Sequence, residues 1–199
     1  MWLDMADSGR PTLHPSSVGQ FFRLQSCPQY LQWEYDEEGR AALARREWEP
    51  KAMSPVLSSE GDTFEQSQLT ALDDGTRDFY GIDGDTGIAF TGTWPDENEI
   101  GRRQLRDRAA AVAAAEPGTE ESVVFQPHFR GTIGAYELAG KGDLLVLESV
   151  ANGVRPTLLE VKSSSEQKVH HRYQATIYAV LLGDFLDEHD IPYEPYYRT

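Results

Sequence analysis

Two aliphatic runs joined by an Asn-Gly pair constrain the fold of this chain more than any other feature. The runs lie at 142–150 and 157–162, and Asn152-Gly153 stands between them. Asn-Gly between such runs is a strong hairpin signal, because both residues readily adopt the positive φ angles of a tight turn. The sequence therefore predicts an antiparallel hairpin over 143–162.

Three charged residues lie at the open end of this expected hairpin. With the turn at the Asn-Gly pair, Asp143 falls opposite 160–162, within a residue or two of register. Glu160 and Lys162 share one face, because side chains alternate along a strand. The hairpin is therefore expected to gather two carboxylates and a lysine at one end.

Two carboxylates beside a lysine suit a site that holds Mg²⁺ or Mn²⁺ and hydrolyses a phosphodiester. A hard cation prefers oxygen ligands, which Asp143, Glu160 and the Val161 carbonyl could supply. Lys162 could place the attacking water or help to deprotonate it. The alternative is an exposed Glu-Lys pair on a strand, which contributes only ~0–1 kcal/mol to stability. The Gly-x-x-Asp motif that ends at Asp143, and the helix that follows, favour the metal site.

A helix is expected directly after the hairpin. The serines at 163–165 form a polar break, and the periodicity that follows predicts a helix over about 169–189. Gln174 and Tyr178 are one helical turn apart, so they share a face near the helix start. The residues expected to form the buried stripe of the helix are Tyr173, Ile177, Val180, Leu181 and Phe185.

Together these motifs resemble the PD-(D/E)XK nuclease superfamily, specifically its RecB-like branch. That branch carries Gly-x-x-Asp, (Asp/Glu)-x-Lys and Gln-x-x-x-Tyr in this order and at similar spacing. The resemblance implies that Asp143, Glu160 and Lys162 occupy the metal-binding and catalytic positions. It also implies that Gln174 and Tyr178 flank the site and the nucleic-acid strand, as substrate-binding residues.

Two looser matches lie upstream. Residues 16–22 and 27–31 resemble the opening segment of the family, in which a helix precedes a Cys-Pro turn and an aromatic residue. Residues 61–65 resemble its first core helix, which carries a His or Glu toward the metal. Because this segment has no histidine, Glu65 is the candidate ligand, and a solvated helix carboxylate is the alternative.

The fold that the resemblance implies is α/β, with a restriction-endonuclease-like core: a small mixed sheet flanked by helices in αβββαβ order. We expect residues 1–11 to be a mobile terminus and 12–199 to form one nuclease domain. The chain stops at Thr199, where a strand is expected to begin, which is compatible with truncation of a longer protein. The remaining expected elements are a helix near 60–73, a strand near 122–130 and a last strand over 193–198.

The function that the resemblance implies is that of a Mg²⁺- or Mn²⁺-dependent deoxyribonuclease in DNA repair, recombination or defence. Single-stranded or end-containing DNA is its expected partner. One alternative is a catalytically weak nucleic-acid-binding or assembly module of a larger nuclease or helicase complex, active with a protein partner. A restriction-type endonuclease that cuts at specific sequences is a third possibility, which shares the same core site.

The composition conflicts with a role in binding phosphates, because the formal net charge is −15. Carboxylates of the site, a basic partner protein or the acidic proteome of a halophilic organism could each explain this charge. The 33 acidic residues against 18 lysines and arginines, with lysine scarce, favour the last explanation. In high salt, DNA binding would depend more on metal bridging and on stacking by aromatics such as Tyr173 or Tyr178.

A basic stripe is conceivable on one predicted helix, formed by Arg102, Arg103, Arg106 and Arg108. Acidic residues interleave with these arginines, so a solvated helix face is the favoured interpretation. The arginines therefore do not predict a basic DNA-binding surface.

The single cysteine, Cys27, fits a reducing cytoplasm, and no apolar run or leader indicates a membrane. Some RecB-like nucleases, including CRISPR-associated exonucleases and AddB-type subunits, hold an iron–sulfur cluster through four cysteines. One thiolate cannot close such a cluster. We therefore expect a cytoplasmic protein with Mg²⁺ or Mn²⁺ as its cofactor, and a longer protein could supply the missing cysteines of a cluster.

Overall fold

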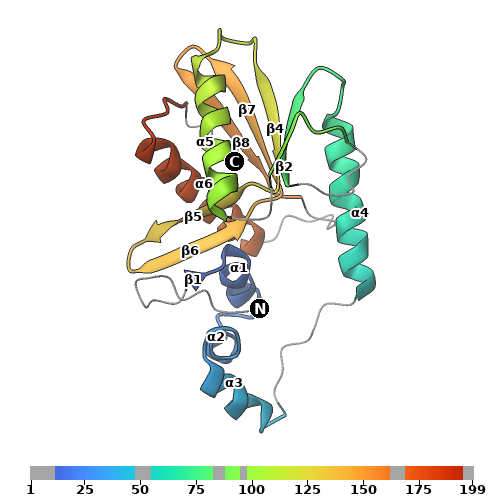
Figure 1. Cartoon of the computed structure of the whole chain (residues 1–199). Coiled ribbons are helices and arrows are strands. Elements are labelled where there is room, and N and C mark those ends of the chain that lie inside the picture. The colour runs from blue at the N-terminus through green and yellow to red at the C-terminus, as the bar shows by residue number, and fades with distance from the viewer. Residues whose placement is uncertain (1–11, 48–54, 83–87, 95–97, 162–168, 195–199) are drawn as a thin grey trace.

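The computed structural model describes residues 12–47, 55–82, 88–94, 98–161 and 169–194 (Figure 1). Its helices are α1 (Pro15–Arg23), α2 (Pro28–Tyr35), α3 (Glu37–Ala44), α4 (Pro55–Leu72), α5 (Asn98–Ala114) and α6 (Val169–Glu188). Its strands are β1 (Thr12–Leu13), β2 (Asp78–Ile82), β3 (Gly92–Trp94), β4 (Glu121–Phe125), β5 (His128–Ile133), β6 (Tyr136–Lys141), β7 (Leu144–Val150) and β8 (Gly153–Leu159). The expected mobile terminus, 1–11, lies outside the described residues.

The strands form two sheets. The larger sheet is mixed and has the order β3-β2-β4-β7-β8, with β2 parallel to both of its neighbours and β7 antiparallel to both of its own. The smaller sheet has the order β1-β6-β5. The predicted hairpin is confirmed as β7 and β8, paired from Val150↔Gly153 at the turn to Leu144↔Leu159 at the open end.

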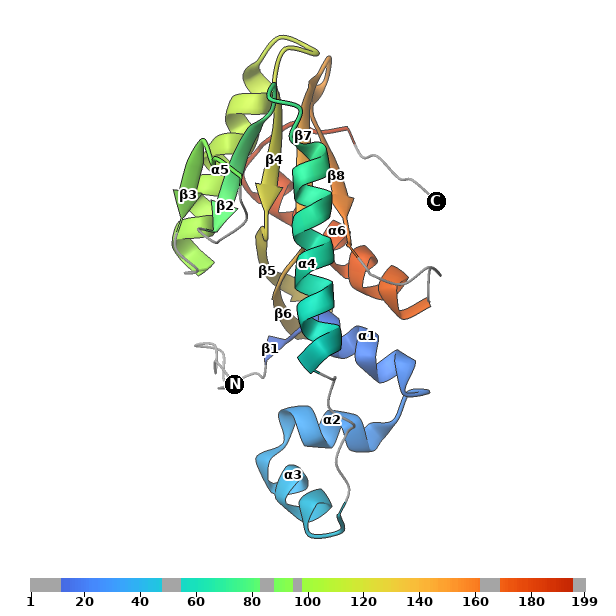
Figure 2. The same ribbon diagram turned by 90° about the vertical axis from the view of Figure 1, so that its right-hand side faces the viewer.

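Apolar side chains alternate along the central strands and bury both faces of the larger sheet. Val123 of β4 and Val146 of β7 pack with Leu69 of α4 in one cluster. Val124 and Leu145, the next residues along, pack with α5 and α6 in the other. Helices therefore cover the sheet on two sides, with α4 in front of it in Figure 2. The predicted α/β class, a small mixed sheet flanked by helices, is confirmed.

Strands β4–β5 and β6–β7 form one long hairpin that bends from the larger sheet into the smaller. At the bend, Gln126 N–H donates to the Asp143 carbonyl (2.9 Å) and Gly142 N–H donates to the Pro127 carbonyl (3.0 Å). Gln126 has a φ of 48°, which interrupts the extended chain. The single strand predicted over 122–130 is therefore wrong, because the chain turns at Gln126-Pro127.

The predicted buried stripe of the last helix is partly wrong. Tyr173 and Val180 are exposed, whereas Leu181 and Phe185 are buried as expected. The stripe that packs on the sheet follows the i, i+3, i+4, i+7, i+8 spacing of an amphipathic helix. Its members are Tyr178, Leu181, Leu182, Phe185 and Leu186.

The N-terminal part of the described chain adds packed helices, whereas the C-terminal part adds a single β-bridge. Helix α1 packs against α6, and α2 is tied back to α1 where His14 N–H donates to the Tyr35 hydroxyl (3.0 Å). The last strand expected over 193–198 is represented by one parallel bridge, Val154↔Tyr193, and 195–199 lie outside the described residues.

Within the part of the chain that the structure describes, no helix has the length and apolar character needed to cross a bilayer.

Candidate active site

The site begins where the β7–β8 hairpin opens. Continuing the Leu144↔Leu159 register by one step places Asp143 opposite Glu160, as the sequence predicts. The Val161 N–H donates to Asp143 Oδ2 at 2.6 Å, so the carboxylate ties the two strands together where their ladder ends. Asp143 also lies at the bend between the two sheets. Asp143 is therefore held at its carbonyl by Gln126 N–H and at its carboxylate by Val161 N–H.

Tyr178 of α6 fastens the helix to this bend. Its side chain is buried, and its hydroxyl donates to the Lys141 carbonyl at 2.5 Å. A Cβ at Gly140 would lie 3.0 Å from the Tyr178 hydroxyl and 2.9 Å from Cδ of Pro15. Gly140 therefore lets the tyrosine and α1 approach the strand. The glycine of Gly-x-x-Asp and the tyrosine of Gln-x-x-x-Tyr are in direct contact.

Electrostatics connect Tyr178 to the two carboxylates. Its pKa is raised well above 10.0, first by burial and then by the negative charge of Glu160. Asp143 raises the pKa further, and a hydrogen bond with the Gln174 side chain opposes the rise. The structure therefore brings five of the predicted site residues together: Asp143, Glu160, Val161, Gln174 and Tyr178.

The two carboxylates belong to the face of the sheet that α6 covers. Leu159 and Val161, on either side of Glu160, pack in the α4 cluster, whereas Leu158 packs on the α6 side. Oε1 of Glu160 is buried from solvent. Glu160 therefore lies on the Tyr178 side of the hairpin end, where its charge acts on the phenol.

Helix α4 reaches the same end of the hairpin from the opposite face. A cavity of about 350 Å³ lies between them, lined by Phe64 and Gln68 of α4 and by Glu160 and Val161. Glu65 belongs to α4, one helical turn before the buried Leu69. The side chain of Glu65 lies outside the described residues, as does the whole of Lys162.

The donor set fits a hard cation. Asp143, Glu160 and the Val161 carbonyl supply oxygen atoms at the open end of the hairpin, and Mg²⁺ is commonly bound through one or two carboxylates with water and phosphate completing the shell. In the described ranges, no group of three His, Cys, Asp or Glu side chains could hold a metal ion.

Tyr178 cannot stack on a nucleic-acid base, contrary to the expectation that its ring is available. Only 2% of the residue is exposed, and its ring packs 5.5 Å from that of Phe129. Sequence reasoning treats Gln-x-x-x-Tyr as a substrate-binding motif and includes Gly140 in Gly-x-x-Asp, but it does not predict the contact between Gly140 and Tyr178. The small size of Gly140, at a fixed distance before Asp143, is the signal that could have revealed the close approach.

The arginines of α5 are largely used within the protein. Arg108 is partly buried and donates to Ser122 (2.7 Å) and Glu120 (2.8 Å), with its guanidinium 4.7 Å from the Tyr80 ring centre. Arg102 lies 5.7 Å from the ring centre of Phe185. The predicted solvated face is therefore wrong for Arg108, which fastens α5 to the sheet.

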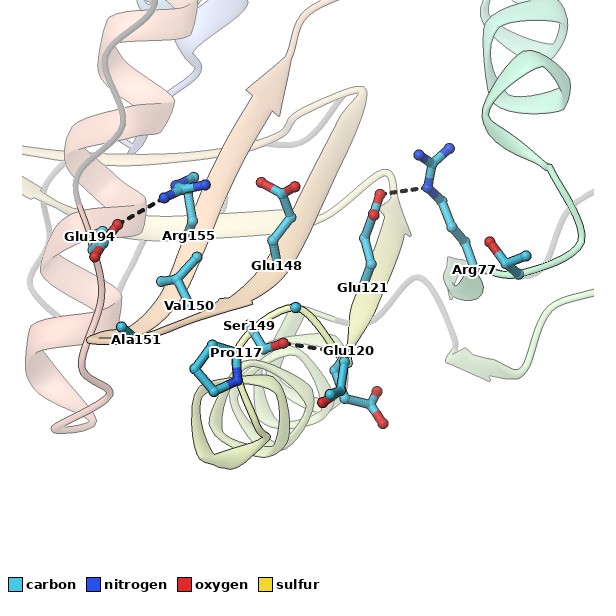
Figure 3. Close-up of a pocket in the computed structure, with 13 residues that line it drawn as sticks. Arg77, Pro117, Glu120, Glu121, Glu148, Ser149, Val150, Ala151, Arg155 and Glu194 are labelled. Atoms are coloured by element: carbon cyan, nitrogen blue, oxygen red, sulfur yellow. Dashed lines mark hydrogen bonds and ion pairs between the residues drawn. The ribbon is translucent and has the colours of Figure 1, made fainter.

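A second, larger cavity of about 660 Å³ lies at the turn end of the hairpin (Figure 3). A row of charged side chains crosses the strands there, with Glu121 opposite Glu148 and Glu148 opposite Arg155. The ends of the row are ion pairs, Arg77–Glu121 (2.5 Å) and Arg155–Glu194 (3.0 Å). No sequence motif marks this cavity, because its residues come from distant segments.

Comparison of the chain with protein-family models, curated proteins and solved structures found no match. The interpretation of the site therefore depends on its residues and their geometry.

Proposed function

We propose that this chain is a metal-dependent deoxyribonuclease domain of RecB-like PD-(D/E)XK type. The observation that carries the proposal is the meeting of Asp143, Glu160, Gln174 and Tyr178 at the open end of one hairpin. Three motifs separated in the sequence converge on one point. Ordinary packing would not require two carboxylates there.

The arrangement of elements supports the proposal. Counting each bent pair as one strand, the order α4, β4–β5, β6–β7, β8, α6 and the Tyr193 bridge follows αβββαβ. Helices α2 and α3, and the β2, β3 and α5 insertion, are additions to this core. A restriction-endonuclease-like core is therefore part of the proposal.

The cation is assigned to Asp143, Glu160 and the Val161 carbonyl, with Glu65 as a candidate further ligand. When bound, Mg²⁺ or Mn²⁺ would polarise the phosphate and lower the pKa of a bound water. The hydrogen bond from Val161 N–H holds the Asp143 carboxylate in one orientation. This orientation reduces the reorganisation needed when the substrate binds.

Lys162 is assigned to the attacking water and to the charge that develops on the scissile phosphate. Tyr178 is a positioning residue. A phenol whose pKa lies above 10.0 is neutral near pH 7, so Tyr178 cannot act as a base there. Its hydroxyl instead fixes Lys141, two residues before Asp143. Gln174 supports it from the preceding helical turn.

The proposed setting is a reducing cytoplasm, consistent with the single cysteine. One alternative keeps the fold without efficient hydrolysis: a binding or assembly module of a larger nuclease complex. The net charge of −15 favours this alternative, because DNA would be repelled unless a partner supplied basic surface.

Cleavage of end-labelled single- and double-stranded DNA with Mn²⁺ or Mg²⁺, from low to molar salt, tests the proposal. The matched control is Asp143→Asn, since its amide oxygen can still accept from Val161 N–H without the charge. We expect metal-dependent products that fall on the order of 100-fold or more in the variant. A folded wild-type protein that is inactive at every salt concentration would favour the binding module.

A further inference from the structure

Two exposed aromatic rings stack on each other where α1 meets α6. Phe22 of α1 and Tyr173 of α6 stack with ring centres 4.1 Å apart and planes 14° from parallel. Phe22 is 38% exposed and Tyr173 is 41% exposed. Phe21 packs edge-on against Phe22 at 5.4 Å. We call Phe22 and Tyr173 the aromatic platform.

The platform belongs to the elements that build the site. Tyr173 directly precedes Gln174 and lies about 7.5 Å along the helix axis from Tyr178. Helix α1, which carries Phe22, packs against α6 and supplies Pro15, whose ring approaches Gly140. The platform therefore lies on the same two helices that contact the strand leading to Asp143, through Pro15 of α1 and Tyr178 of α6.

Two exposed arginines neighbour the platform residues in the sequence. Arg23 and Arg172 adjoin its two rings in the sequence, and both are exposed. Aromatic rings interleaved with basic side chains are typical of surfaces that bind single strands, where rings stack on bases and cations meet phosphates. Local arginines are notable in a chain with a net charge of −15.

We propose that Tyr173, supported by Phe22, stacks on an unpaired base of a single strand led to the Asp143–Glu160 site. This inference depends on the proposed function and specifies its substrate as single-stranded DNA. Bases within a duplex already stack on each other and present no free face to the ring. Stacking releases few counterions, so it remains useful when high salt weakens phosphate contacts.

The test measures binding of a short single strand that carries the fluorescent base 2-aminopurine, in an Asp143→Asn background that prevents cutting. Tyr173→Ala should weaken binding by about 5- to 150-fold and remove quenching of the probe. Tyr173→Phe should preserve both, and Tyr173→Leu should lose both, because leucine has apolar area but no ring. Binding of the matching duplex should change little.

Tyr136→Ala is the matched control, because Tyr136 is the more exposed tyrosine (59%) and lies about 16 Å along β6 from Lys141. It should bind like the parent. If Tyr173→Ala bound the single strand as tightly as the parent, the platform would be overturned. Full binding by Tyr173→Leu would also overturn it, because an apolar side chain without a ring would then suffice, as in a protein–protein contact. Wild-type cleavage is measured separately. Absence of cleavage with Tyr173-dependent binding present would overturn only the hydrolysis. Cleavage without any single-strand binding would overturn only the platform, and absence of both would overturn both.

Discussion

The two ends of the β7–β8 hairpin both gather carboxylates but surround them with different partners. At the turn end, Glu148 lies opposite Arg155 in a row of partly exposed charges that ends in ion pairs (Figure 3). At the open end, Asp143 accepts a backbone N–H, and Glu160 acts on the buried phenol of Tyr178. The turn end pairs its carboxylates with arginines, whereas the open end places its carboxylates beside a backbone N–H and a buried tyrosine.

The difference in partners implies a difference in role. Exposed acid–arginine pairs contribute little to stability and are screened by salt, so they mainly keep the surface soluble. A carboxylate fixed by a backbone N–H near a buried tyrosine is oriented in advance, which a metal ligand requires. Placement of the acids, rather than their number, distinguishes the two ends.

The largest expected effect comes from neutralising one acid at each end. Glu160→Gln should lower the rate of DNA cleavage on the order of 100-fold or more, because it removes a charged ligand for the cation. Glu148→Gln, the same change at the turn end, should leave the rate within about twofold. Initial rates with saturating Mn²⁺ measure both variants.

Calorimetric titration with Mn²⁺ sharpens this contrast, since Glu160→Gln should weaken metal binding and Glu148→Gln should not. Equal cleavage rates for the two variants would contradict the proposed distinction between the ends, and so would a larger loss of cleavage rate in Glu148→Gln.

A smaller effect is expected from Gly140→Ala, which tests the close approach at the bend. The added Cβ would meet Pro15 and the Tyr178 hydroxyl at 2.9 and 3.0 Å, so the free energy of unfolding should fall by about 1–3 kcal/mol. Gly183→Ala in α6 is the control, because its Cβ would have only an ordinary contact at 3.4 Å. Urea denaturation should show Gly183→Ala at least as stable as the wild type.

Removing the Tyr178 hydroxyl should have a further effect that depends on pH. Tyr178→Phe loses the hydrogen bond to Lys141, which should cost about 1–2 kcal/mol near pH 7. The folded pKa of Tyr178 lies above the unfolded value of 10.0, so the folded state keeps its proton longer. Wild-type stability is therefore complete below pH 10 and declines above it, and Tyr178→Phe should decline less steeply. The free energy of unfolding is measured by urea denaturation at several pH values above 10. If it declined equally with pH in the wild type and in Tyr178→Phe, the burial of this phenol would be contradicted.

Local signals in the sequence predict the hairpin and the helix that follows, because turn chemistry and periodicity act over a few residues. The opposition of Asp143 and Glu160 follows from the turn position alone. The bend at Gln126-Pro127 does not, because it depends on pairing with residues that are distant in the sequence.

Burial on α6 illustrates the other limit of the sequence. Periodicity shows that one face is apolar, yet Tyr173 and Tyr178 both fit an apolar stripe until the packing partner is known. The sheet covers Tyr178, while α1 leaves Tyr173 exposed in a stack with Phe22. The contact between Gly140 and Tyr178 joins segments 38 residues apart and has no local signal.

The smallest expected effect lies in the ion pairs at the turn end. Arg155 and Asn152 donate to Glu194 and lower its pKa below 4.5, with the Arg155 hydrogen bond the larger cause. A lowered folded pKa adds stability above pH 4.5, and this contribution is lost as the pH falls through the folded pKa. Glu194→Gln should thus be slightly less stable than the wild type at pH 7 and equal to it in acid, by urea denaturation. Because both charges are partly exposed, molar salt should also abolish the difference. A large loss at pH 7, or one that persists in acid and salt, would mean that the turn end is held as firmly as the candidate site.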